Sequence, residues 1–211
     1  MKKAEIKTPF FKMVEEIVLP QGFIKQKNSE GYEYIKKRDN GFIAVNPMIW
    51  SYSPLFFISL GFACRINEIS QILAHIDNIS DEFKDNYTTV GFDIRSLVQV
   101  QDERIRVETE EDLQKGLFFL KGVLENQGLP FFENFQTIAD FDKDFNRANR
   151  PKDLYAHQES IGLISAVLNK NPQAKYWENY YRESIQKMNQ YTKSQYEKLV
   201  SYLKKNYPGV L

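Results

Sequence analysis

The chain has 211 residues, of which 42% are hydrophobic, and its 28 basic and 28 acidic side chains balance. This composition is close to the globular average, so it excludes a disordered chain and predicts a folded core. No run approaches the ~18 consecutive apolar residues of a membrane span. The single cysteine, Cys64, excludes an internal disulfide and a cysteine-based metal site. We therefore expect a cytoplasmic protein that does not associate with a membrane.

The first predicted element is a helix that begins at Thr8 and Pro9. Threonine can cap free N–H groups, and proline is tolerated at the first helical position. The apolar residues that follow recur at helical spacing and define one face. They are Phe10, Met13, Val14, Ile17 and Val18. The run Leu19-Pro20-Gln21-Gly22 is expected to end this helix.

Residues 22–108 carry most of the strand signals. Residues 39–41, Asp-Asn-Gly, predict a hairpin turn between two strands. The clearest strand is 55–66, because alternate residues along it are apolar and predict a buried face. These residues are Phe56, Ile58, Leu60, Phe62, Cys64 and Ile66. A short helix after Asn67 and further strand-like runs around 87–94, 97–101 and 104–108 complete an antiparallel sheet of about five or six strands.

The remainder of the chain reads as helical. Thr109 and Asp112 form a capping pattern at the start of a helix, and Gly128 and Pro130 are expected to end it. The segments that follow show helical periodicity and no convincing strand. We predict an α+β fold in which an antiparallel sheet with flanking helices, residues 1–127, precedes an all-helical C-terminal third, residues 128–211. The two regions form either separate domains or one packed domain.

Few residues suit catalysis. The chain has two histidines, and His157 falls in the apolar stripe of a predicted helix, which favours a buried structural histidine over a catalytic one. The catalytic alternative joins His157 to Asp140 and Asp144 as the carboxylate–histidine site of a hydrolytic or transfer enzyme. Cys64, in the apolar phase of its strand, is expected to have a raised pKa and to be unreactive.

Metal and cofactor sites are not predicted. The alternation of Asp140, Asp142 and Asp144 is similar to the start of a calcium loop, but Phe145 stands where such a loop needs glycine, and Pro151 stands where it needs glutamate. Isolated glycines form neither a dinucleotide fingerprint nor a P-loop. We therefore expect no metal and no cofactor.

Two groups of residues are candidates for binding. Trp177, Tyr180 and Tyr181 share one helix face, which indicates either core packing or a recognition surface. Arg147 and Arg150 bracket a loop that could contact phosphate or an acidic partner, or could simply be a solvated turn.

The first third of the chain contains the runs FFKMVEEIVLPQGFIKQK, YEYIKK and LFFISLGF. This order of amphipathic helix, Gly-Phe with basic residues, tyrosine-rich hairpin and apolar strand resembles small uncharacterised bacterial domains of unknown function. Some of those domains resemble immunity proteins, which neutralise a partner toxin by binding it. The resemblance implies a binding role and supplies no catalytic residue.

Together these features favour a non-catalytic protein-binding module over an enzyme. The charge is segregated, with an acidic middle at 61–144 between basic stretches at 1–38 and 145–211. Another protein is the expected partner. Nucleic-acid binding by the basic C-terminal helices is the least favoured alternative, and the pattern does not specify an oligomeric state.

Overall fold

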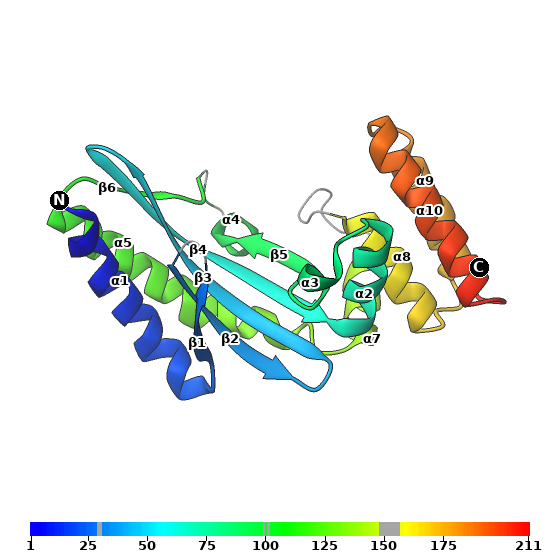
Figure 1. Ribbon diagram of the computed structural model, residues 1–211, viewed down its shortest axis with the longest axis horizontal. Coiled ribbons are helices and arrows are strands. Elements are labelled where there is room, and N and C mark those ends of the chain that lie inside the picture. The colour runs from blue at the N-terminus through cyan, green and yellow to red at the C-terminus, as the bar shows by residue number, and fades with distance from the viewer. Residues whose placement is uncertain (29–30, 99, 101, 148–156) are drawn as a thin grey trace. The chain divides into compact units, whose positions relative to one another are not determined.

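The computed structural model describes residues 1–28, 31–98, 100, 102–147 and 157–211, and it confirms the predicted α+β class. Within these residues six strands form one sheet in the order β1-β2-β3-β4-β5, and β6 also pairs with β4 (Figure 1). The pairings β1–β2, β2–β3 and β4–β6 are antiparallel, as predicted. The strands are β1 (Ile24–Asn28), β2 (Gly31–Arg38), β3 (Gly41–Tyr52), β4 (Leu55–Ile66), β5 (Val90–Asp93) and β6 (Ile105–Val107).

Helices precede the first strand, lie between the later strands and make up the C-terminal third. They are α1 (Lys3–Val18), η1 (Leu19–Gln21), α2 (Asn67–Ile76), α3 (Asp81–Lys84), α4 (Ile94–Leu97), α5 (Glu110–Val123), η2 (Leu124–Gly128), α6 (Leu129–Glu133), α7 (Ile138–Phe145), α8 (Gln158–Leu168), α9 (Ala174–Ile185) and α10 (Gln190–Asn206). In the part of the chain that is described, none of them combines the length and the apolar character that crossing a bilayer requires.

The chain forms two compact units, each made from two stretches of sequence. Unit 1 comprises residues 1–64 and 91–134, and unit 2 comprises residues 65–90 and 135–211. Residues 128–134, which the sequence grouped with the helical region, therefore lie in unit 1. Helix α2 lies with the C-terminal helices in unit 2.

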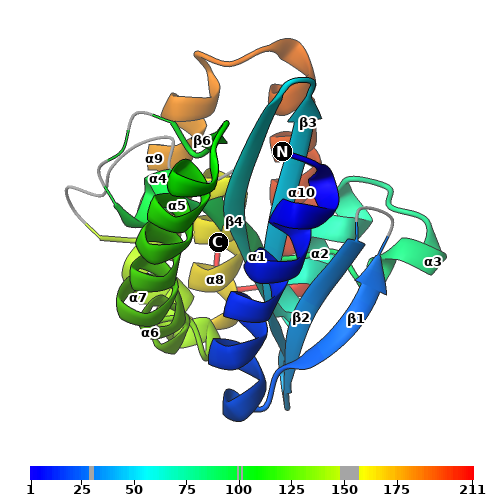
Figure 2. The ribbon, with the colours of Figure 1, turned by 90° about the vertical axis from the view of Figure 1, so that its left-hand side faces the viewer.

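The core of unit 1 lies between its sheet and helices α1 and α5, which cover one face (Figure 2). The predicted apolar phase of β4 is confirmed, because all six of its residues are buried. Helix α1 begins at Lys3 and not at Thr8 as predicted. Ile6 explains the extra turn, since it is fully buried and extends the apolar face one turn ahead of Phe10.

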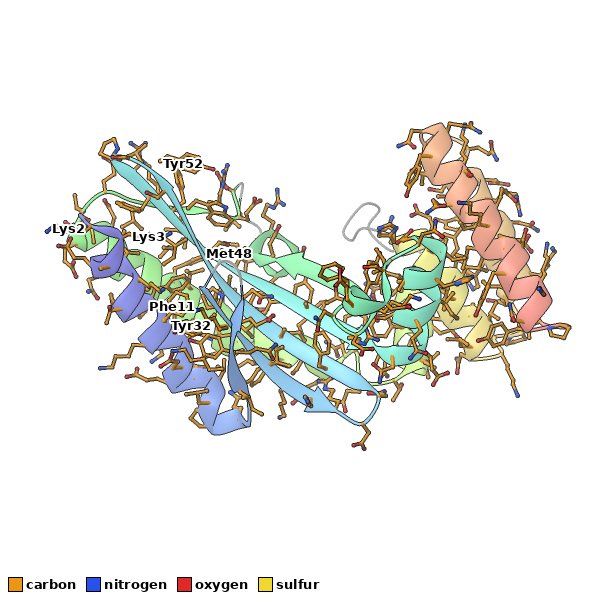
Figure 3. All side chains as sticks on the ribbon, viewed as in Figure 1. Lys2, Lys3, Phe11, Tyr32, Met48 and Tyr52 are labelled. Atoms are coloured by element: carbon orange, nitrogen blue, oxygen red, sulfur yellow. The ribbon has the colours of Figure 1, made fainter. Side chains whose placement is uncertain are left out.

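Aromatic and polar contacts join α1 to the β1–β2 hairpin. The rings of Phe11 and Tyr32 meet edge to face with centroids 5.9 Å apart (Figure 3). The Lys25 ammonium lies 4.1 Å from the Tyr32 centroid and 2.6 Å from a Glu15 carboxylate oxygen. Glu15 also accepts a hydrogen bond from the hydroxyl of Tyr34. These contacts fix the hairpin against the helix.

The helix that starts at Glu110 does not end at Gly128 and Pro130, so that prediction is wrong. A π-helical turn, η2, carries the chain through Gly128 into α6, and Pro130 lies in the first turn of α6. A Cβ on Gly128 would lie 2.4 Å from Cε1 of Phe62. Close packing, and not helix termination, therefore requires glycine here.

The predicted strand-like run at 97–101 is only partly described, because residues 99 and 101 lie outside the described residues. Its first residue, Leu97, ends helix α4 (Ile94–Leu97), whose first turn is capped by the Asp93 side chain accepting from the Arg95 N–H. The neighbouring prediction is confirmed, since Ile105–Val107 is strand β6 and Thr109 and Asp112 form a capping box at α5.

Unit 2 is built on α8, which packs against α2, α7, α9 and α10, while α9 and α10 lie side by side (Figure 1). The carboxylate of Asp142 is buried and accepts hydrogen bonds from the side-chain amides of Asn146, Asn169 and Asn171 at 2.6–3.0 Å. Because these three amides satisfy the charge, they fix α7 to the end of α8.

A second buried carboxylate, Glu178, joins α9 to α10. It pairs with Lys175 at 2.7 Å and with Arg182 and Lys204 at 3.0 Å. Burial alone would raise the pKa of Glu178, but hydrogen bonds from the three cations lower it to about 2.

Candidate functional site

The candidate site is a pocket in unit 2 with a volume of about 720 Å³. This volume lies in the range of natural ligand pockets, about 300–1,000 Å³. Helices α2, α8 and α10 and the turn between α9 and α10 supply its lining. The lining residues are Leu73, Ile76, Asp77, Ile79, His157, Gln158, Glu159, Ser160, Ile185, Met188, Tyr191, Thr192, Gln195, Tyr196 and Leu199.

The floor of the pocket is apolar. Leu73, Ile185 and Leu199 are buried and belong to the core of the unit. Met188 is partly exposed, and Tyr191 at the rim is 69% exposed. The pocket therefore combines a fixed hydrophobic base with side chains that solvent or a ligand can reach.

The first turn of α8 brings polar groups to the pocket. Glu159 is only 6% exposed, and its Oε1 accepts a hydrogen bond from the Ser184 hydroxyl at 3.1 Å. Gln158 is also buried, and its side-chain oxygen has no hydrogen-bond donor among the described residues. Both groups therefore keep acceptor positions that the described residues do not fill.

A second carboxylate, Asp77, lies at the end of α2. It accepts from the Tyr87 hydroxyl at 2.5 Å and from Nε2 of Gln195 at 3.3 Å. Burial, followed by the hydrogen bond to Asp77, raises the pKa of Tyr87 above its usual value. The phenol therefore stays a donor near neutral pH and holds the Asp77 carboxylate in place.

His157 lines the pocket but is exposed, so the prediction of a buried structural histidine is wrong. Helix α8 begins at Gln158, and His157 precedes it with a left-handed backbone, φ 58°. Helical periodicity does not apply to a residue outside the helix, which is why the apolar stripe gave the wrong environment.

The structure does not gather Asp140 and Asp144 around His157 in this pocket, because neither aspartate is among the lining residues. Asp140 forms a capping box with Thr137 at the start of α7. Asp144 lies one turn later and pairs with Arg147 at 3.3 Å.

The aromatic residues of α9 separate into two groups. Trp177 and Tyr181 are buried, at 7% and 5% exposure, which places them in the core. Tyr180 is exposed, and its ring stacks on that of Tyr176 with centroids 6.3 Å apart. Arg147 is exposed, and Arg150 lies outside the described residues.

Part of the basic charge of the C-terminal helices is neutralised internally. Lys175, Arg182 and Lys204 all pair with Glu178, so these cations already have a carboxylate partner. The carboxylate of Asp142, which the sequence pattern grouped with a calcium loop, accepts hydrogen bonds from asparagine amides. Among the residues described, no cluster of three or more His, Cys, Asp or Glu side chains could hold a metal ion.

The chemistry of Cys64 follows the prediction. The thiol is buried in β4, and burial, which outweighs the charge of Arg38, raises its pKa to about 12. Such a thiol stays protonated and is a poor nucleophile at neutral pH.

Sequence reasoning missed the polar groups of the pocket. Gln158 and Glu159 directly precede the apolar run of α8, and Asp77 follows the apolar stripe of α2. Each is an ordinary helix-end residue in the sequence, and only the packing of three helices gathers them.

Comparisons of the chain with protein-family models, with curated proteins and with solved structures found no match.

Proposed function

We propose that this chain is a non-catalytic protein-binding module that receives a segment of a partner protein in the pocket of unit 2. The observation that carries the proposal is the pocket itself, in which a buried apolar floor is surrounded by polar and aromatic side chains. Protein recognition sites commonly have this arrangement, because a desolvated apolar centre supplies affinity and a polar rim supplies specificity.

The lining chemistry supports binding. Met188 can adapt its shape to a partner, and Tyr191 offers a large contact area with little entropy to lose. The carboxylates of the catalytic alternative have other roles, Asp140 in a cap and Asp144 in an ion pair. A narrower form of the proposal, motivated by the resemblance of the first third to immunity-type domains, is that the partner is a toxin neutralised by binding.

A pocket-filling variant tests the proposal. Thr192→Trp places a large side chain at the lining of the pocket from the partly exposed start of α10. The control is Tyr180→Ala, which alters an exposed aromatic residue outside the pocket. Tagged wild type and both variants, with matched thermal unfolding, are used for affinity capture from the source cells. We expect a specific partner to be lost with Thr192→Trp and retained with Tyr180→Ala. Equal capture by all three proteins would contradict the proposal.

A further inference from the structure

Among the described residues, no cationic side chain pairs with Glu159, a buried carboxylate of the pocket. Glu159 is 6% exposed, and the hydrogen bond that it accepts among the described residues comes from a neutral hydroxyl, that of Ser184. A carboxylate offers about four acceptor positions. Burial of an ionised group is costly unless an opposite charge or several donors compensate it. The contrast with Glu178, which has three cations around it, shows how this fold satisfies a buried glutamate elsewhere.

A neighbouring acceptor is also unsatisfied. Gln158 lines the same pocket and is only 8% exposed. Its side-chain oxygen is buried and has no hydrogen-bond donor among the described residues. Unpaired buried acceptors are rare in folded proteins. Two adjacent residues in one helical turn thus present acceptor oxygens that need N–H donors.

In the described part of the lining, acidic side chains are present and the strong bases lysine and arginine are not. Its carboxylates are Glu159 and Asp77. Other polar groups that face this region are uncharged: Gln158 and Ser160 from α8, Gln195, Thr192 and Tyr191 from α10, and Ser184 from α9. An occupant with a positive charge is therefore complementary to the pocket, and one with a negative charge is not.

We infer that the partner inserts a lysine side chain into the pocket, with its ammonium group at Glu159 and Gln158 and its methylene chain along the apolar floor. A lysine combines an aliphatic stem with three N–H donors, which matches a pocket with apolar residues such as Ile76 and Leu199 and two acceptor groups. This inference rests on the proposed function, because it assigns the cation to a protein partner.

The test uses n-butylammonium, which reproduces the lysine side chain. Binding to the full chain is followed by amide chemical shifts in NMR titrations, with 1-butanol and butanoate as matched probes of the same length. We expect n-butylammonium to shift amides at the start of α8 and to bind Glu159→Gln at least ~10-fold more weakly, the effect of losing about 1.4 kcal/mol. Equal binding of the three probes, or equal binding of n-butylammonium to wild type and Glu159→Gln, would overturn the inference.

A second pair of variants keeps the test decisive if Glu159→Gln does not fold. Met188→Lys supplies a tethered ammonium from the partly exposed pocket lining, whereas Met188→Gln is a neutral control of similar length. Met188→Lys should weaken n-butylammonium binding and Met188→Gln should not. Equal effects of the two variants would contradict a cation site.

Binding of a captured partner to wild type and to Glu159→Gln distinguishes failure of this inference from failure of the proposed function. If a captured partner binds wild type and Glu159→Gln equally, the lysine assignment is overturned and the protein-binding proposal stands. If n-butylammonium binds in a Glu159-dependent manner but no partner is lost on filling the pocket, the protein source of the cation is overturned. Loss of the partner with Glu159→Gln, together with loss when its own lysine is changed to norleucine, supports both.

Discussion

Gly162 in α8 packs directly against Tyr181 in α9, so that a Cβ on the glycine would lie 2.2 Å from the phenol oxygen. That hydroxyl lies 2.8 Å from both the carbonyl oxygen of Phe145 and Oδ1 of Asn146, and it can donate to either. The carbonyl of Gly162 in turn accepts from the Asn146 amide at 2.8 Å. The absence of a side chain at one position thus lets three helices of unit 2 share one hydrogen-bond network.

Gly162→Ala should therefore destabilise the protein strongly. The new methyl group cannot fit without displacing Tyr181, and overpacking of this kind costs about 3 kcal/mol. Gly122→Ala is the control, because no atom lies within 4 Å of a Cβ at that helical position. Alanine there should stabilise the chain by about 0.5–1 kcal/mol. Thermal and urea unfolding measure both, and similar stabilities of the two variants would refute the packing account.

Asp142→Asn should also be costly, because it replaces a buried carboxylate acceptor with an amide that faces three amide donors. Hydrogen bonds to a charged group are worth about 1.5–3 kcal/mol each, and the loss should be at least of this order. Asp81→Asn is the matched control, since the Asp81 side chain is 94% exposed and pairs with Lys84 on the surface. Its effect on the free energy of unfolding should be small, because solvent screens an exposed ion pair. Urea unfolding at neutral pH compares the two.

The contribution of Glu178 to the free energy of unfolding should depend on pH in the acid range. Its pKa falls from 4.5 to about 2 on folding, so its contribution to stability is complete above pH 4.5 and is lost as the pH falls towards 2. We expect Glu178→Gln to destabilise the chain by about 2 kcal/mol at pH 7, allowing for solvent around the three cations.

The stability difference between wild type and Glu178→Gln should then shrink between pH 4.5 and pH 2. The control is Glu183→Gln, on the same helix but exposed, which should change stability little throughout. Urea unfolding across this pH range gives the comparison. A difference for Glu178→Gln that stays constant with pH would show that the carboxylate is not held ionised by its partners.

The sequence predicted elements whose signals are local. All six residues that alternation along β4 predicted to be buried are buried, and the Thr109–Asp112 pattern located the start of α5. The same local reasoning gave a wrong helix end at Gly128, because glycine with a proline soon after it is typical of a helix end. In the structure, the lack of a side chain at Gly128 makes room for the ring of Phe62, a residue distant in sequence. Local propensity gives no information on such contacts.

The candidate site could not be predicted from the sequence for the same reason. Its acceptors come from α8, whereas Asp77 comes from α2 and Gln195 from α10, and no spacing along the chain relates them. The aromatic stripe of α9 was a clear signal, and the sequence left two interpretations open. Packing decided between them, since Trp177 and Tyr181 are buried and Tyr180 is exposed.

The most direct test of the central claim is site-specific photo-cross-linking. Tyr191, at the pocket rim, and Tyr180, outside it, are exposed tyrosines of the same unit. Each is replaced in turn by p-benzoylphenylalanine, which is close to tyrosine in shape, and the full chain is irradiated in the source cells. The account predicts a specific cross-linked partner protein from position 191 and none from position 180. A cross-link from position 180 alone, or the same weak set of proteins from both positions, would contradict a partner-binding pocket in unit 2.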